Sequence, residues 1–241
     1  MTLMQRAVAL IYPDQCAVCP NFIGSHGDLC ASCWRETRFT SGLTCDLCAS
    51  PLLGDGDEGS EVCDECKAKP RPWSKGRAAL YYTGVGRRIV LSLKYADRTD
   101  LAQPAAKWMH RAALDMLNGD TVLLPIPSHW LRLVRRRYNP AVELAKALGR
   151  VSGNKVLHDG LLRHRSTKTQ EGLGYDERFE NLNNAFRVNS RREAEISGKS
   201  ICILDDTFTS GATLTAATET ALQAGAKTVS VLVLARTLKN P

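Results

Sequence analysis

The chain has 241 residues, of which 44% are hydrophobic and 24% charged, a composition typical of soluble globular proteins. Its length fits one or two domains, and no apolar run approaches the roughly 18 residues that a membrane-spanning helix needs. The short apolar start lacks a small-residue cleavage site, which argues against a secretory signal. We therefore expect a cytoplasmic protein without membrane insertion.

Charge and cysteine are unevenly distributed along the chain. Residues 1–75 carry 7 Lys and Arg against 10 Asp and Glu, whereas residues 76–241 carry 25 against 15. Eight of the nine cysteines lie within residues 16–66. This asymmetry predicts two domains. Residues 1–72 would hold a short N-terminal helix and a cysteine-rich module, and residues 73–241 would form a basic domain.

The eight clustered cysteines form four Cys-x-x-Cys pairs, a spacing that places two sulfurs on one side of a tight turn. Two such pairs make a tetrahedral sulfur cage that suits structural Zn²⁺ and leaves no open position for a substrate. An internal repeat between residues 16–20 and 45–51 favours two consecutive sites, although the spacing also permits interleaved pairing. The predicted ligands are Cys16, Cys19, Cys30 and Cys33 for one zinc, and Cys45, Cys48, Cys63 and Cys66 for the other.

Other interpretations of the first 72 residues fit less well. Disulfides need an oxidising compartment, and iron–sulfur clusters use other cysteine spacings. Residues 54–61 look like a calcium loop but lack the ligand register and flanking helices of an EF-hand, so a solvated loop is expected. Residues 67–72 contain two prolines and indicate a linker. The ninth cysteine, Cys202, is expected to be an inert strand residue.

From residue 73 onward, strand and helix patterns alternate. Short apolar runs between polar loops are typical of buried strands, and Asn139 followed by Pro140 is typical of a helix start. Strands are expected at residues 77–82, 121–126, 201–204 and 229–234, and helices at 85–95, 101–117, 140–148 and 212–224. This order predicts an α/β fold with a parallel, doubly wound sheet.

Residues 201–213 (Ile-Cys-Ile-Leu-Asp-Asp-Thr-Phe-Thr-Ser-Gly-Ala-Thr) join a strand, two acids and a helix start. Ligands of such sheets bind at the carboxyl ends of strands. Asp205 and Asp206 are therefore expected to be exposed at that edge, where adjacent carboxylates suit the two hydroxyls of a ribose. The following hydroxyls, backbone N–H groups and helix N-terminus suit a phosphate. The predicted phosphate cradle consists of Thr209, Ser210, Gly211, Ala212 and Thr213.

This stretch resembles the phosphoribosyl-pyrophosphate motif of type I phosphoribosyltransferases, with Thr207 where Val is usual. The whole chain resembles the ComF family, the competence protein F-like proteins, in the order of its motifs. These are a double zinc ribbon, Leu93-Lys-Tyr95, Leu124-Pro-Ile-Pro127, Arg137-Tyr-Asn139, Thr169-Gln170, Arg178 and Asn181. Family members more often have Arg-Gly-Phe-Asn-Gln where this chain has Arg136-Arg-Tyr-Asn-Pro140.

The resemblance implies a type I phosphoribosyltransferase-like sheet behind an N-terminal double zinc ribbon. It also implies a 5-phosphoribosyl diphosphate-type ligand bound with Mg²⁺. Asp205 and Asp206 would hold the ribose hydroxyls and residues 209–213 the 5-phosphate. Residues 127–139 would occupy the position of the pyrophosphate loop. Residues 163–174 stand where these enzymes carry a mobile loop. Cations that suit a diphosphate or DNA phosphates are Arg132, Arg135, Arg136, Arg137, Arg163, Arg165, Lys168 and Lys94.

Three functions remain open at this point, and no catalytic residue is assigned. The family resemblance implies DNA uptake and natural transformation, with single-stranded DNA and a competence helicase as partners. Ten Lys and Arg against two acids in residues 132–168 fit that role, with Trp130 and Tyr138 for stacking. An active enzyme would transfer the ribosyl 5-phosphate to a small amine or base, which nothing in the sequence identifies. An adaptor would dock a partner on its zinc ribbon and use the sugar-phosphate site as a sensor.

Overall fold

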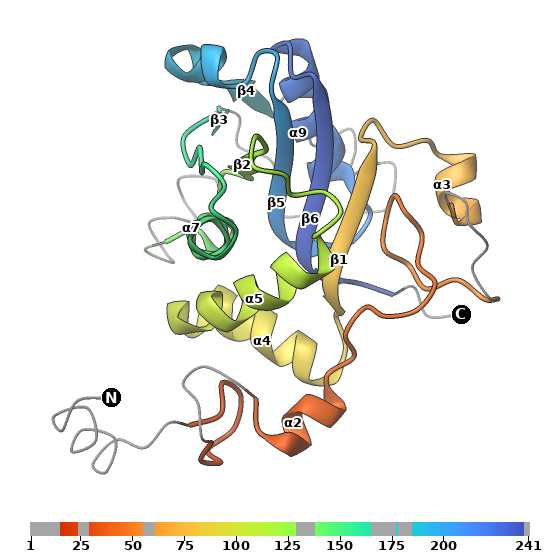
Figure 1. The fold of residues 1–241 in the computed structure, drawn as a ribbon, viewed down its shortest axis with the longest axis vertical. Coiled ribbons are helices and arrows are strands. Elements are labelled where there is room, and N and C mark those ends of the chain that lie inside the picture. The colour runs from red at the N-terminus through yellow and green to blue at the C-terminus, as the bar shows by residue number, and fades with distance from the viewer. Residues whose placement is uncertain are drawn as a thin grey trace, which may run out of the picture.

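The computed structural model describes residues 15–23, 29–54, 61–128, 138–164, 177 and 185–238. At its centre is a parallel sheet of four strands in the order β1-β6-β5-β2 (Figure 1). These strands are β1 (Lys75–Tyr81), β2 (Val122–Pro125), β5 (Ser200–Phe208) and β6 (Thr228–Arg236). A separate antiparallel pair consists of β3 (Leu161–Arg163) and β4 (Phe186–Val188). The predicted parallel α/β fold is confirmed.

Helices cover both faces of the central sheet (Figure 1). One face carries α4 (Gly84–Tyr95), α5 (Ala102–Ala112) and α7 (Pro140–Ser152), and the other carries α9 (Ala212–Gln223). Because successive side chains of a strand point to opposite faces, β5 sends Cys202 and Leu204 into the first layer and Ile201 and Ile203 into the second. In the part of the chain that the structure describes, no helix is long and apolar enough to cross a membrane.

Most predicted elements are confirmed, with changes at their ends. The helix expected at 101–117 is a 3₁₀ turn, η1 (Thr99–Leu101), followed by α5, and residues 113–116 form turns. Helix α7 continues four residues beyond the predicted end, to Ser152, where Gly153 adopts a left-handed conformation with φ of 77°. The strands β3 and β4 and the 3₁₀ helix η2 (Ser190–Glu195) were not predicted, because elements this short carry little periodicity.

The two cysteine modules lie at different places on the sheet domain (Figure 1). The first module contains α2 (Ala31–Glu36), which contacts α4, whereas the second contains α3 (Asp64–Ala68) and lies beside β1. Cys30 and Cys33 of the first module pack in the apolar layer of α4 and α5. Cys45 and Cys48 of the second pack in the layer of α9. Each module therefore shares a core with the sheet, while the boundary between residues 72 and 73 stays a prediction.

The first module also continues the sheet. Residues 38–40 run along the outer edge of β1, where the Tyr81 N–H donates to the Arg38 carbonyl over 2.8 Å. The Thr40 N–H donates to the Ala79 carbonyl over 3.1 Å. These bonds pair backbone groups that an edge strand otherwise leaves open to other chains.

Candidate ribose-phosphate site and metal centres

Two clusters of four cysteines occur in the described residues, and each contains two consecutive Cys-x-x-Cys pairs. They are Cys16, Cys19, Cys30 and Cys33, and Cys45, Cys48, Cys63 and Cys66, with the four sulfurs of each within 4.8 Å of one another. The Sγ atoms of Cys19 and Cys30 are 3.5 Å apart, and those of Cys48 and Cys63 are 3.6 Å apart. Zn–S bonds of about 2.3 Å in a tetrahedron place sulfurs about 3.8 Å apart. Both clusters fit zinc, and the consecutive pairing is confirmed over the interleaved one.

The two clusters are built alike. The Cys30 N–H donates to the Cys16 sulfur over 3.3 Å, and the Cys63 N–H donates to the Cys45 sulfur over 3.4 Å. Cys30 and Cys63 are also the N-cap residues of α2 and α3. Hydrogen bonding with the Ser32 hydroxyl, followed by the Cys33 backbone, lowers the pKa of the Cys30 thiol to about 5, whereas burial raises the pKa of Cys33 in the same cluster. Zinc binds the thiolate form of cysteine, which hydrogen bonds such as those at Cys30 favour.

The two predicted sugar-binding acids lie inside β5. The strand was expected to end at residue 204 but continues to Phe208, paired in register with β6. On its other side β2 ends at Pro125, opposite Leu204. Asp205 is half-buried and Asp206 is 8% exposed, so the prediction that both acids are exposed is wrong. Pairing with β6 keeps them in the strand, and both lie just beyond the last residue of β2.

Consecutive strand residues face opposite sides of a sheet, so the two carboxylates have different surroundings. Asp206 faces α4, where Lys94 Nζ lies 2.6 Å from Asp206 Oδ1 and donates to Thr207 Oγ1 over 3.0 Å. Although burial acts in the opposite direction, the Asp206 carboxylate raises the pKa of Lys94, which keeps the ammonium charged. Lys94 thus lies against one of the two predicted sugar-binding acids, and its role as a phosphate-binding cation stays a prediction.

Asp205 lies on the other side, where the charge of Arg163 on β3 acts on it. Burial, followed by the charge of Asp206, raises the pKa of Asp205 to about 7. Its Oδ1 accepts the Asp206 N–H over 2.8 Å. The two acids therefore differ. Asp206 has an ammonium partner, whereas Asp205 gains or loses its proton near neutral pH.

The loop after β5 leads directly into α9, as predicted. Gly211 is the N-cap residue of α9 and has φ of 87°, a conformation that favours glycine. The Ser210 hydroxyl accepts the Ala212 N–H over 3.4 Å, while Thr209 is exposed and Thr213 half-buried. The loop thus combines hydroxyls with a helix N-terminus, and its role as a phosphate cradle stays a prediction.

Several predicted features lie outside the described residues. They are the N-terminal helix, residues 165–174 of the predicted mobile loop, Trp130, and the cations Arg132, Arg135, Arg136, Arg137, Arg165 and Lys168. Both ends of the expected pyrophosphate-loop segment are described. The Asn139 side chain donates to the Ile126 carbonyl over 2.8 Å, and the Tyr138 hydroxyl donates to the Leu93 carbonyl. The segment between β2 and α7 therefore ends beside Lys94.

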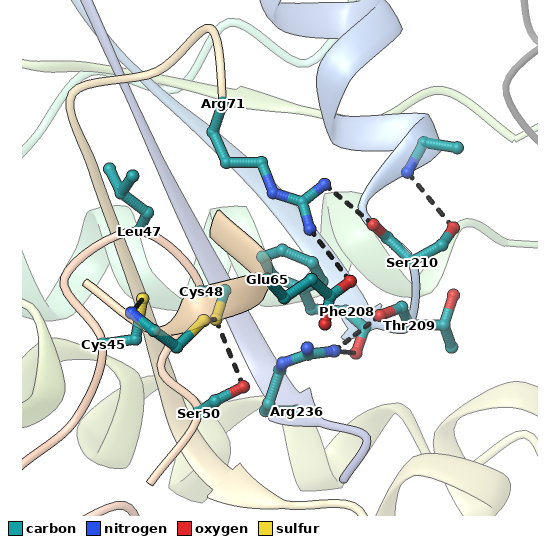
Figure 2. A network of polar contacts seen from close by, with 12 residues as sticks. Cys45, Leu47, Cys48, Ser50, Glu65, Arg71, Phe208, Thr209, Ser210 and Arg236 are labelled. Carbon is teal, nitrogen blue, oxygen red and sulfur yellow. Dashed lines mark hydrogen bonds and ion pairs between the residues drawn. The ribbon is translucent and has the colours of Figure 1, made fainter. Parts of the chain in front are cut away.

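Two arginines that contact the loop at 209–213 were not predicted as site residues. Arg236, at the end of β6, donates to the carbonyls of Phe208, over 2.9 Å, and Thr209. Arg71, in the predicted linker, donates to the Ser210 carbonyl over 3.0 Å (Figure 2). Residues 67 and 68 of that linker belong to α3. The prolines that flank Arg71 are a weak signal for a rigid segment, and no pattern in the sequence marks Arg236.

Residues 7–73 match the family model of the double zinc ribbon domain. The chain is 30% identical to the DNA utilization protein YhgH of Salmonella typhimurium over 235 residues, which cover 95% of this chain and 100% of that protein. Competence protein F of Haemophilus influenzae is 25% identical over 213 residues, covering 86% of this chain and 90% of that protein. Competence protein ComFC of Bacillus subtilis is 25% identical over 244 residues, covering 96% and 88%.

Among solved structures, the allosteric regulatory enzyme of purine biosynthesis aligns with 60% of this chain and 30% of its own, at 17% identity and a TM-score of 0.37. The phosphoribosylpyrophosphate synthetase of Mycobacterium smegmatis aligns with 58% and 34%, at 20% identity and a TM-score of 0.32. The similarity to YhgH covers nearly the whole of both chains, so it includes the metal modules and the sheet domain together. The chain belongs to the ComF family, the family of YhgH and the competence proteins F and ComFC.

Proposed function

We propose that this protein binds a 5-phosphoribosyl diphosphate-type ligand with Mg²⁺ at the carboxyl end of β5, and that it acts in DNA uptake and natural transformation. The observation that supports this ligand is that Asp205, Asp206 and Lys94 lie together next to the loop that precedes α9. The names of the relatives, DNA utilization and competence proteins, support the biological role.

Each group has a separate task in this proposal. The carboxylates of Asp205 and Asp206 accept hydrogen bonds from the ribose hydroxyls, and the loop at 209–213 holds the 5-phosphate at a helix N-terminus. Two carboxylates repel a ligand rich in phosphate, and Lys94 offsets that repulsion because its ammonium lies 2.6 Å from Asp206. Bound Mg²⁺ would supply further charge neutralisation between donor oxygens, for which carboxylates are suitable neighbours.

Calorimetric titration of 5-phosphoribosyl diphosphate with Mg²⁺ tests the site. We expect binding to weaken at least about tenfold in Asp205→Asn/Asp206→Asn, a loss of about 1.4 kcal/mol or more. The matched control is Asp115→Asn, because Asp115 pairs with Lys75 and Arg77 at the start of β1, at the opposite end of the sheet. Equal weak heats in the wild type and the double variant would refute the assignment.

We further propose that the basic segment at 132–168 contacts single-stranded DNA, with a competence helicase as the partner. Ten Lys and Arg against two acids support this, because such a stretch can follow a phosphate backbone. The affinity for an oligonucleotide should fall with salt, with a log–log slope of about −0.7 for each phosphate neutralised. A slope near zero contradicts backbone binding. Weaker DNA binding in the presence of the donor would show that the two ligands share cations.

Turnover of a small amine or base is the second candidate function. It is favoured by the Lys94 ammonium, which lies beside the two acids and would stabilise the negative charge that a departing diphosphate gains. In that reaction the bond from the anomeric carbon to the diphosphate breaks, the acceptor nitrogen bonds to that carbon, and the nitrogen loses a proton. Release of diphosphate that depends on an added amine or base supports the enzyme. Tight donor binding without release favours binding alone.

A further inference from the structure

Arg71 joins the second zinc module to the loop at 209–213, which leads into α9. Its side chain is 2% exposed and lies between two acceptors (Figure 2). Nη1 donates to the Ser210 carbonyl over 3.0 Å, and Nη2 donates to Glu65 Oε1 over 3.4 Å. Glu65 belongs to α3, between the metal-cluster residues Cys63 and Cys66. A single guanidinium thus connects a metal-binding helix to the candidate phosphate loop.

The surroundings of Arg71 fix its position. Its guanidinium lies 5.7 Å from the ring centres of both Trp73 and Phe208, and these rings contact each other edge to face at 5.8 Å. A Cβ at Gly211 would lie 3.0 Å from Arg71 Nη1 and 2.8 Å from the Phe208 ring. The loop therefore approaches the arginine as closely as a glycine permits.

Arg71 and Arg236 together hold three successive carbonyls, that of the last residue of β5 and those of the next two residues. Arg236 bonds those of Phe208 and Thr209, and Arg71 bonds that of Ser210 (Figure 2). In a trans peptide the N–H of the next residue points away from the carbonyl. Holding these carbonyls on the arginine side directs the N–H groups of residues 209–211 to the opposite side. Successive N–H groups that point one way form an anion-binding nest.

Among the described residues, only the second zinc module contacts the loop at 209–213. Its cysteines share an apolar core with Phe208 and Ala212, whereas those of the first module pack with α4 and α5. The first module has a comparable ion pair, in which Arg88 Nη2 lies 3.5 Å from Glu36 Oε2. That pair is 50% and 63% exposed and joins α2 to α4, far along the chain from the loop.

We propose that Arg71 is a positioning residue for the phosphate loop, and that the zinc site of the second module sets its position through Glu65. Zinc at Cys45, Cys48, Cys63 and Cys66 holds α3, α3 holds Arg71, and Arg71 holds the Ser210 carbonyl. The first zinc site does not act on the loop. The ligand moiety concerned is a phosphate monoester. The inference rests on the proposed function, because it concerns how the phosphate part of that site is held.

Hydrogen exchange of the backbone amides at 209–213, measured without ligand, tests the coupling by itself. We expect exchange about tenfold faster in Arg71→Ala and a smaller increase in Glu65→Gln and Arg71→Lys. Arg88→Ala, which breaks the exposed pair of the first module, should leave this exchange unchanged. A zinc count of two per chain in Arg71→Lys and Glu65→Gln shows that these variants retain both modules.

A matched pair of metal variants assigns the effect to one module. Cys19→Ser and Cys63→Ser each replace a partly buried ligand, one in each cluster, and each should lower the zinc content from two to one. Faster exchange at 209–213 is expected only in Cys63→Ser. The proposal is overturned if neither variant differs from the wild type in exchange at 209–213, or if exchange increases equally in both.

Titration of 5-phosphoribosyl diphosphate with Mg²⁺ separates this proposal from the previous one. If the wild type binds the donor, Kd should rise about tenfold in Arg71→Ala, with partial recovery in Arg71→Lys. If the wild type does not bind it, the proposed function fails, and altered exchange in Arg71→Ala and Cys63→Ser still supports the coupling. Wild-type affinity in both variants, with unchanged exchange, refutes the coupling alone.

Discussion

Asp205 lies half-buried in β5, and burial together with the charge of Asp206 raises its pKa to about 7. The folded chain therefore keeps this proton at pH values where the unfolded chain, with an aspartate pKa of about 3.9, has lost it. The contribution of the Asp205 carboxyl to stability is full below about pH 4 and is lost as pH rises through about 7. The stability of the folded chain should thus fall over this interval.

We predict that the thermal midpoint of the wild type, measured relative to Asp205→Asn, falls as pH rises from about 6 to about 7.5. Asn cannot ionise, and both proteins carry the same zinc sites, so the difference isolates Asp205. Donor affinity should rise over the same interval in the wild type, because the ionised carboxylate accepts ribose hydroxyls. A difference in midpoint that does not change with pH would show that Asp205 is already ionised.

The ion pair between Lys94 and Asp206 is largely buried, with side chains 21% and 12% exposed. Removing the ammonium leaves a carboxylate with little access to water. We predict that Lys94→Met lowers the free energy of unfolding by about 1–3 kcal/mol in chemical denaturation. Lys146→Met, which breaks the more exposed pair with Glu143, should change it by less than about 0.5 kcal/mol. Equally small losses of unfolding free energy in both variants would show that the pair of Lys94 and Asp206 stabilises the fold no more than an exposed pair does.

At the scale of elements, the segment between β2 and α7 depends on Asn139. Its Oδ1 caps α7 by accepting the Ala141 N–H over 3.1 Å, and its Nδ2 donates to the Ile126 carbonyl over 2.8 Å. One side chain therefore joins the two ends of the expected pyrophosphate loop. Asn189 makes a similar arrangement at η2, where it accepts the Arg191 N–H and donates to the Asp159 carbonyl.

We predict that Asn139→Ala lowers the free energy of unfolding by about 1–3 kcal/mol, from the lost cap and the unpaired Ile126 carbonyl. Asn139→Asp should recover part of this loss, because an aspartate still caps the helix. Donor affinity should fall in Asn139→Ala but not in Asn189→Ala, although both lose stability. Denaturation and calorimetry on the same preparations measure both effects. An unaltered donor affinity in Asn139→Ala would exclude a role for the loop in binding.

The sequence predicts those elements whose pattern is local. The spacing of the cysteines indicates both metal clusters, and the Asn139-Pro140 cap indicates the start of α7. The extent of β5 is not local, because it depends on pairing with β6 beyond the point where β2 ends. The contact of Arg71 with Ser210 joins residues 139 positions apart, and only the folded chain brings them together.

For the whole molecule, the zinc modules are parts of the fold and not appendages. The first module packs in the core of α4 and α5 and covers the edge of β1 through residues 38–40. The second packs against Phe208 and Trp73 in the other core. Zinc binding supplies about 10 kcal/mol or more to the folding of such modules. Loss of metal should therefore disturb both layers of the sheet domain.

We predict that the protein contains two zinc ions per chain, and that a strong chelator lowers its thermal midpoint and makes it aggregate. Aggregation follows because unfolding of the first module exposes the backbone of β1, and an open strand edge pairs with other chains. Metal analysis and light scattering during chelation measure the two effects. The control is Cys202→Ala, since burial raises the pKa of that thiol to about 12 and it lies outside both clusters. This variant should keep both zinc ions and respond to the chelator as the wild type does. Full zinc loss without aggregation would mean that residues 38–40 stay on β1 without the metal, held by Phe39, which packs at 5.6 Å against Trp108 of α5.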